Sequence, residues 1–214
     1  MVKIFRFDND TKEFSANTYI IGKIGSFCLV VDLGSTSKEI YEYIDNHYDH
    51  CLGVLLTHAH FDHIRGLTKF LRHFNYDIPV YLSEADLPLL TDSTSNFSKS
   101  QGEDVKVNID PVTVKDGDEL VFKKEMHVKV IATPFHTEGS VCYLFDDDNA
   151  LFSGDTLFKG SIGRSDLATS DPDKVIPSLK KLMKLRDTLV VYPGHGDITR
   201  LGEEKKNNPF LKQL

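Results

Sequence analysis

The amino-acid sequence predicts an α/β or α+β protein with a layered sheet core. Short apolar runs with strand character alternate along the chain with amphipathic segments of helical period. Side chains that can bind metal ions follow the ends of several of these apolar runs. A chain of 214 residues can bury one sizeable core, so we expect a single domain over residues 1–214.

The expected elements follow in chain order. Strands are expected near residues 2–7, 17–23, 26–32, 51–57, 80–82 and 188–192, with several short strands between 105 and 153. Helices are expected over 36–48, 64–71, 83–90 and 172–186, the first capped by serines and the last opened by Asp171 and Pro172. Residues 91–104 are polar, rich in serine and without periodicity, which predicts an exposed loop that borders the site.

The segment 57–63, Thr-His-Ala-His-Phe-Asp-His, follows directly on an apolar run. His58 and His60 are two residues apart, so in extended backbone their side chains leave on the same side. Asp62 is expected at the N-cap of the next helix, with His63 in its first turn. One loop histidine is usually a solvated residue, but four such groups in six residues predict a metal site. Nitrogen and oxygen ligands without a thiolate suit zinc, iron or manganese in an open, catalytic site.

Three later segments repeat this arrangement of a polar ligand after an apolar strand. His136, Asp155 and His195 each follow such a run, with glycine or proline nearby to allow a sharp turn. Taken singly, each is an ordinary loop residue. Together with the first cluster they form a candidate ligand set of His58, His60, Asp62, His63, His136, Asp155 and His195. The set is too large for one tetrahedral ion, so it predicts two ions.

This set resembles the metallo-β-lactamase-fold hydrolases, whose motif is His-x-His-x-Asp-His followed by a histidine, a bridging aspartate and a final histidine. The resemblance includes Val-Asp-Leu-Gly at 31–34 and spans nearly the whole chain. Segments 153–158 and 160–166 are similar to the single-domain glyoxalase II-like (hydroxyacylglutathione hydrolase-like) branch in particular. Phe135 and Glu138 stand where that branch commonly has glycine and proline, and a phenyl ring beside His136 is expected to reshape the pocket.

The resemblance implies a four-layer αβ/βα sandwich and two divalent metal ions, zinc first, with iron or manganese as alternatives. It implies the following ligand assignment: one ion on His58, His60 and His136, a second on Asp62, His63 and His195, and Asp155 bridging the two. Asp32 would orient the ligand turn; the alternative is that it only starts a turn after a strand.

Two cations that share Asp155 would also share a water and lower its pKa enough to supply hydroxide near neutral pH. Asp62 would accept a hydrogen bond from that hydroxide and orient it. A thiolate leaving group needs little protonation, which favours hydrolysis of a thioester such as an acylglutathione. Arg164 is the candidate for binding a substrate carboxylate, Lys159 a weaker one; alternatively, Arg164 pairs with Asp166.

Only 19 residues follow His195 (214 minus 195), so the helical extension with which glyoxalase II binds glutathione is not expected. Three other functions stay open. The first is an iron-dependent persulfide dioxygenase with a facial triad of His58, His136 and Asp155. The second is another metallohydrolase of this fold, a lactonase or a β-lactamase, and the third is a non-catalytic metal-binding scaffold.

Composition limits the partners. The formal net charge is −7 and no basic stripe exists, which argues against nucleic acid. No stretch has the apolar length of a membrane span, and the N-terminus lacks a signal-sequence pattern. Three cysteines in apolar, strand-like segments predict reduced thiols and a cytoplasmic location. The expected partner is therefore a small-molecule thioester substrate, without nucleic acid or membrane.

Overall fold

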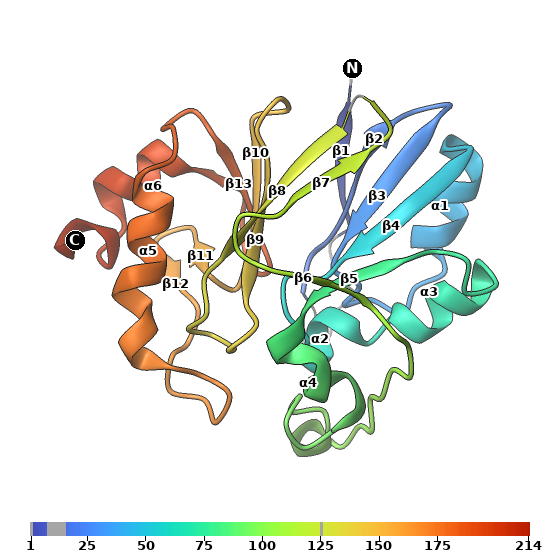
Figure 1. Ribbon diagram of the computed structural model, residues 1–214, viewed down its shortest axis with the longest axis horizontal. Helices are drawn as coiled ribbons and strands as arrows, with labels where there is room; N and C mark the ends of the chain where they lie inside the picture. The colour runs from blue at the N-terminus through green and yellow to red at the C-terminus, as the bar shows by residue number, and fades with distance from the viewer. Residues whose placement is uncertain (1, 8–15, 125) are drawn as a thin grey trace. The chain divides into compact units, whose positions relative to one another are not determined.

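The computed structural model describes residues 2–7, 16–124 and 126–214, which form two compact units whose elements Figure 1 labels. Unit 1 consists of Met1–Leu82 and Leu87–Thr113, and unit 2 of Ser83–Asp86 and Val114–Leu214. Each unit is built around one mixed six-stranded sheet, which confirms the expected α/β or α+β class. The single domain over residues 1–214 stays a prediction.

The sheet of unit 1 has the strand order β1-β2-β3-β4-β5-β6. The strands are β1 (Lys3–Phe7), β2 (Thr18–Lys23), β3 (Phe27–Val31), β4 (His50–Leu55), β5 (Val80–Ser83) and β6 (Val112–Val114). β1, β2 and β3 pair antiparallel, whereas β3, β4 and β5 pair parallel. Every residue of β3 is buried, as its continuous apolar sequence Phe-Cys-Leu-Val-Val requires of a strand covered on both faces.

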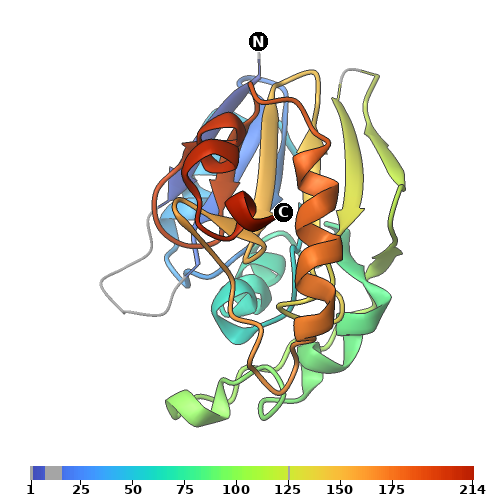
Figure 2. The ribbon, with the colours of Figure 1, turned by 90° about the vertical axis from the view of Figure 1, so that its left-hand side faces the viewer.

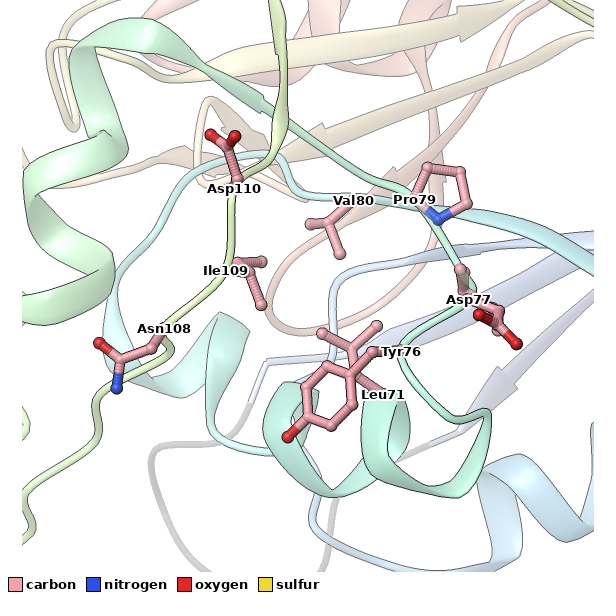
Figure 3. Close-up of a pocket in the computed structure, with 9 residues that line it drawn as sticks. Leu71, Tyr76, Asp77, Pro79, Val80, Asn108, Ile109 and Asp110 are labelled. Carbon is pink, nitrogen blue, oxygen red and sulfur yellow. The ribbon is translucent and has the colours of Figure 1, made fainter.

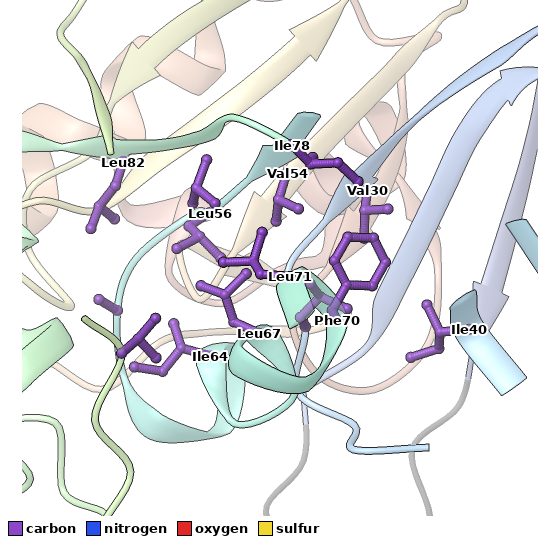
Figure 4. Close-up of a cluster of buried hydrophobic side chains, with 14 of the residues drawn as sticks. Val30, Ile40, Val54, Leu56, Ile64, Leu67, Phe70, Leu71, Ile78 and Leu82 are labelled. Carbon is purple, nitrogen blue, oxygen red and sulfur yellow. The ribbon is translucent and has the colours of Figure 1, made fainter. Parts of the chain in front are cut away.

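Helices cover the sheet of unit 1 with apolar faces. They are α1 (Glu39–His47), α2 (Phe61–Ile64), α3 (Leu67–His73) and α4 (Leu87–Thr91). Ile40 of α1 and Phe70 of α3 join Val30 and Val54 of the strands in one buried cluster (Figure 4). Burial of this apolar surface stabilises the strand before the histidine cluster and the helix after it.

Two helix predictions in this region are wrong in detail. The helix expected over 64–71 is divided into α2 and α3, because the Gly66 amide donates to the Leu33 carbonyl oxygen at 2.8 Å instead of continuing the helical hydrogen bonds. α2 begins at Phe61 with His60 as its N-cap, so Asp62 lies inside the first turn and is not the N-cap. The helix expected over 83–90 is a 3-10 turn, Glu84–Asp86, followed by α4.

The segment 91–104 is exposed at most of its positions, as its composition predicts, but its centre is buried. Asn96 and Ser98 are fully buried, and a 3-10 turn covers Lys99–Gln101. The Asn96 amide donates hydrogen bonds to the carbonyl oxygens of Leu89 and Val105. These bonds tie the centre of the segment to the rest of unit 1, since a buried amide must find backbone partners.

The sheet of unit 2 has the order β14-β13-β10-β9-β8-β7. Its strands are β7 (Glu119–Phe122), β8 (Met126–Ala132), β9 (Val141–Phe145), β10 (Ala150–Gly154), β13 (Val190–Pro193) and β14 (Thr199–Arg200); β11 (Leu157–Phe158) and β12 (Ser161–Ile162) form a separate hairpin. Only the β10–β13 pair is parallel among the pairs of this sheet. β10 and β13 therefore end at the same edge, where Asp155 and His195 follow.

Helices α5 (Val175–Met183) and α6 (Leu201–Asn207) belong to unit 2 and face the viewer in Figure 2. Leu179 and Leu182 of α5 pack into a buried cluster with Leu151 of β10 and Val191 of β13. A 3-10 turn, Pro172–Lys174, precedes α5, and the Asp171 carboxylate caps it by accepting from the Asp173 amide, as expected. A last 3-10 turn covers Leu211–Gln213.

Further expectations concern single residues. Phe135 is fully buried in the core of unit 2, so its ring fills the interior beneath His136 and does not line a solvent-filled pocket. Cys28, Cys51 and Cys142 are free thiols, as expected. Among the described residues, no helix has the length and apolarity to cross a bilayer.

Candidate metal centre

Unit 1 brings His58, His60, Asp62 and His63 together in the turn between β4 and the start of α2. The three histidines are between 0% and 4% exposed, which is unusual for this residue type outside a functional site. The His58 ring lies 4.8 Å from that of His60 and 4.0 Å from that of His63, centroid to centroid. Ligand atoms of the pairs His58–His60, His58–His63 and Asp62–His63 lie within 4.8 Å of one another.

Asp32 holds this turn from the end of β3. It is 2% exposed and has a φ of 55°, a left-handed conformation that aspartate tolerates better than most residues. Its carboxylate accepts three hydrogen bonds, each 2.8 Å long: from the Thr57 amide, the Thr57 hydroxyl and His63 Nδ1. Asp32 therefore orients the ligand turn, and the alternative of a simple turn-starting residue is excluded.

The same hydrogen bonds set the tautomers of two histidines. His63 donates from Nδ1 to Asp32, so its Nε2 carries the lone pair. The Thr57 hydroxyl donates to Asp32 and accepts from His58 Nδ1 at 3.2 Å, so the lone pair of His58 is also on Nε2. Both rings thus present Nε2 as the ligand atom, the form in which a neutral imidazole binds a metal.

The segment 94–98 supplies a wall of the unit 1 cluster. The Asn96 carbonyl accepts a hydrogen bond from the Phe61 amide, at the start of α2. The Phe97 ring lies 5.0 Å from the His60 ring in an edge arrangement, with the Phe97 backbone at a φ of 68°. The prediction that 91–104 borders the site is confirmed for His60, but no periodicity or motif singled out these two residues.

Unit 2 brings His136, Asp155 and His195 together. Asp155 Oδ2 lies 3.4 Å from His136 Nε2 and 3.6 Å from His195 Nε2. Two ligands that are each about 2.0–2.2 Å from one tetrahedral ion lie roughly 3.4 Å apart. The Asp155–His136 and Asp155–His195 distances therefore each fit a pair of ligands on a divalent cation, with Asp155 common to both pairs.

His136 is oriented by the loop that follows β12. Its Nδ1 donates to the Arg164 carbonyl oxygen at 2.9 Å, which leaves the lone pair on Nε2. The Ser170 hydroxyl donates to the His136 carbonyl oxygen at 2.8 Å. Gly163 is required in this loop, because a Cβ there would lie 1.8 Å from the Asp155 carbonyl oxygen and 3.2 Å from His136 Nδ1.

The Arg164 side chain points to solvent and pairs with Asp166. Two hydrogen bonds join them, from Nε at 2.8 Å and from a terminal nitrogen at 3.0 Å. The guanidinium lowers the pKa of the Asp166 carboxyl, and the carboxylate raises the pKa of Arg164. Arg164 thus forms the alternative pair with Asp166 that the sequence left open, while its role in substrate binding stays a prediction. Lys159 likewise pairs with Asp197, at 3.1 Å.

A separate pocket of about 440 Å³ lies in unit 1 (Figure 3). Leu71, Tyr76, Ile78 and Ile109 give it an apolar wall, with Asp77 and Asp110 at its edge. None of the residues that line it belongs to the candidate ligand set. We assign it no part in the metal chemistry.

The family of the chain follows from comparison with known proteins. A model of the metallo-β-lactamase superfamily matches residues 11–195, and the chain belongs to this superfamily. The protein is a metallo-hydrolase of a superfamily that binds divalent metals, and its fold class is the metallo-β-lactamase fold, as the sequence predicts.

Two relatives with hydrolase names align with most of the chain. The chain is 36% identical over 186 residues to a probable metallo-hydrolase, YqgX, of Bacillus subtilis (strain 168), covering 86% of this chain and 87% of that protein. It is 28% identical over 203 residues to the hydroxyacylglutathione hydrolase GloC of Haemophilus influenzae (strain ATCC 51907 / DSM 11121 / KW20 / Rd), covering 92% and 93%.

Two solved structures are similar over nearly their whole length. BLEG-1, a B3 metallo-β-lactamase, superposes with a TM-score of 0.88 at 29% identity, covering 98% of this chain and 99% of that one. TTHA1623 in a di-iron-bound form gives a TM-score of 0.82 at 32% identity, covering 96% and 100%.

Proposed function

We propose that the protein is a thioester hydrolase that acts on hydroxyacylglutathione-type substrates with two divalent metal ions. Zinc is the expected metal, and iron and manganese are the alternatives. In this proposal the first ion binds His58, His60 and His136, the second binds Asp62, His63 and His195, and Asp155 bridges them. The hydrogen bonds of Asp32, Thr57 and the Arg164 carbonyl support it, since they set three of the histidines to bind through Nε2.

One observation carries the choice of substrate. The Haemophilus influenzae relative is named a hydroxyacylglutathione hydrolase, and the match covers more than nine-tenths of both chains. The carboxylate of Asp155 beside two histidines adds a chemical argument, because an all-nitrogen-and-oxygen ligand set suits hydrolysis without a covalent intermediate.

When bound, divalent metals would supply an activated water and polarise the scissile carbonyl. Asp62 would accept a hydrogen bond from the attacking water and orient it. The leaving thiolate of glutathione needs no general acid at neutral pH, because its conjugate thiol has an ordinary pKa of about 8.5–9. Arg164 would exchange its exposed partner Asp166 for a substrate carboxylate, since a surface pair of this kind is held weakly.

The test is metal reconstitution followed by a hydrolysis assay on lactoylglutathione. Metal-free protein is loaded with zinc, iron or manganese, its metal content is measured, and thioester cleavage is followed by thiol release. We expect about two ions per chain and turnover that a chelator abolishes. His136→Ala should lose metal and activity, whereas His127→Ala, at an exposed histidine of β8 outside the set, should keep both.

A second function has a specific observation in its favour. The similar TTHA1623 structure is a di-iron-bound form, so a protein of this fold takes up iron. An iron-dependent persulfide dioxygenase would instead use His58, His136 and Asp155 as a facial triad on one iron. Anaerobic purification, metal analysis and oxygen uptake on glutathione persulfide separate the two reactions. One iron per chain with oxygen uptake, and no thioester turnover with any metal, would replace the hydrolase proposal.

The similarity to BLEG-1 places β-lactams and lactones in the same substrate panel. Turnover of either, without thioester cleavage, would keep the metallo-hydrolase class and change its substrate. Failure of every substrate with metal fully loaded would favour a metal-binding scaffold.

A further inference from the structure

Asp86 is a buried carboxylate that no part of the proposed ligand set uses. It ends the 3-10 turn Glu84–Asp86, belongs to unit 2 and is fully buried. Burying a charged carboxylate is costly unless strong donors compensate it. We infer that Asp86 is a positioning residue, whose carboxylate fixes the turn that carries His136 and thereby sets the affinity of the metal ion that His136 binds. This inference rests on the proposed metal centre.

Each oxygen of Asp86 holds a different point of the turn after His136. Oδ2 accepts a hydrogen bond of 2.8 Å from the Thr137 hydroxyl, and Oδ1 accepts one of 2.8 Å from the Gly139 amide. Hydrogen bonds to an ionised acceptor are about twice as strong as neutral ones. The carboxylate therefore holds the side chain of Thr137, one residue beyond the ligand, and the backbone of Gly139, three residues beyond it.

The turn itself is closed by Ser140. Its hydroxyl accepts from the Thr137 amide at 2.9 Å and lies 2.8 Å from the Thr137 hydroxyl, and its carbonyl oxygen accepts from the Thr133 amide at 2.8 Å. Thr137 and Ser140 are 0% and 4% exposed, so water cannot replace these partners readily. Asp86, Thr137 and Ser140 form one buried polar network, and such networks are rigid when every member is satisfied.

Gly139 shows how closely the carboxylate fits. A Cβ at this position would lie 2.5 Å from Asp86 Oδ1 and 2.8 Å from Asp86 Cβ. Only glycine lets the backbone approach the carboxylate this closely. The sequence pair of Asp86 and Gly139 is therefore a matched contact between segments that are 53 residues apart.

His136 is thus held at three points: its ring by the Arg164 carbonyl, its own carbonyl by Ser170, and the following turn by Asp86. The first two contacts orient the ring and its residue. The third prevents the turn from rotating and carrying Nε2 away from Asp155. Partners of this outer kind typically change metal affinity by about 10–100-fold when they are lost.

The test uses Asp86→Ala, Asp86→Asn and Thr137→Val in the full chain. Cobalt(II) affinity is measured by chelator competition, together with the cobalt absorption spectrum and the thermal unfolding of the metal-free protein. We expect Asp86→Ala to weaken the binding of the cobalt ion that His136 holds about 10–100-fold and to shift the cobalt absorption spectrum. Asp86→Asn should lose less cobalt affinity than Asp86→Ala. Its side-chain oxygen can still accept from the Gly139 amide, while the Thr137 hydroxyl turns to the Ser140 hydroxyl.

Thr137→Val removes one hydrogen bond and leaves the carboxylate in place. This variant should therefore fold and show an intermediate loss of cobalt affinity. The double variant Asp86→Ala/Thr137→Val should lose no more cobalt affinity than Asp86→Ala alone, because both residues act through the same contact. Asp116→Asn is the matched control: its carboxylate also accepts a backbone amide and a side-chain donor in unit 2, from Ala132 and Lys181, and should not change cobalt affinity.

The inference is overturned if Asp86→Asn and Thr137→Val both fold and bind cobalt with the wild-type affinity and spectrum. If Asp86→Ala does not fold, these two variants decide the question by themselves. A wild-type protein that binds no cobalt would instead overturn the proposed metal centre, so the two failures are distinguishable.

Discussion

Asp32→Asn tests how the protein prepares its histidines for metal. The substitution keeps the shape of the side chain and suits the left-handed φ of 55°, because asparagine tolerates that conformation. It replaces one of two buried oxygens by an amide group that can only donate. We expect metal affinity to fall while the backbone stays in place.

The magnitude follows from the three donors around Asp32. Oδ2 accepts from the Thr57 hydroxyl and His63 Nδ1, and Oδ1 accepts from the Thr57 amide. In one orientation the new amide group opposes the Thr57 amide, leaving buried donors without acceptors at a cost of about 1–3 kcal/mol. In the other it faces His63, whose ring must then carry its proton on Nε2, the proposed ligand atom. Either orientation should weaken metal binding by about 10–100-fold.

The assay is chelator competition for zinc or cobalt, with thermal unfolding of the metal-free variant. Asp45→Asn is the matched control, since Asp45 also pairs with a histidine of unit 1, His73 Nε2, at 2.7 Å. Both side chains of this pair are more than one-third accessible, at 47% for Asp45 and 35% for His73. It should change stability by less than about 0.5 kcal/mol and leave metal affinity unchanged. Wild-type affinity and stability in Asp32→Asn would refute the argument.

Three other outcomes can be checked directly. Asp155→Ala should lose most bound metal and all hydrolysis, because Asp155 Oδ2 lies beside both His136 and His195; elemental analysis at the wild-type level would remove it from the site. Arg164→Ala should raise the KM for anionic thioesters and leave metal content alone, and an unchanged KM would return Arg164 to its pairing role. Burial raises the pKa of the Cys142 thiol to about 11, so at pH 8 it stays protonated and should resist iodoacetamide until the protein is unfolded. Rapid alkylation of native Cys142, detected by mass spectrometry, would contradict this.

The sequence by itself determined the ligand types and the class of fold. Strand alternation and turn chemistry are local properties, so His58 and His60 could be assigned to one side of an extended segment from their spacing alone. The apolar runs before Asp155 and His195 likewise indicated that both residues follow buried strands, and β10 and β13 confirm this. Helix boundaries were less predictable, because α2 and α3 are divided where the Gly66 amide donates to the distant Leu33 carbonyl oxygen.

Tertiary structure alone decided which side chains hold the ligands. Asp86 is joined to Thr137 across 51 residues of chain, and Asp32 to His63 across 31, and neither pair has a periodic signal in the sequence. The polar segment around Asn96 is buried for the same reason, since its amide meets backbone carbonyls that packing brings to it. Residue type and spacing fix what a side chain can bind. Which partner it meets depends on how separate segments pack, because hydrogen bonds reach only about 3 Å and therefore form after the chain has brought those segments together.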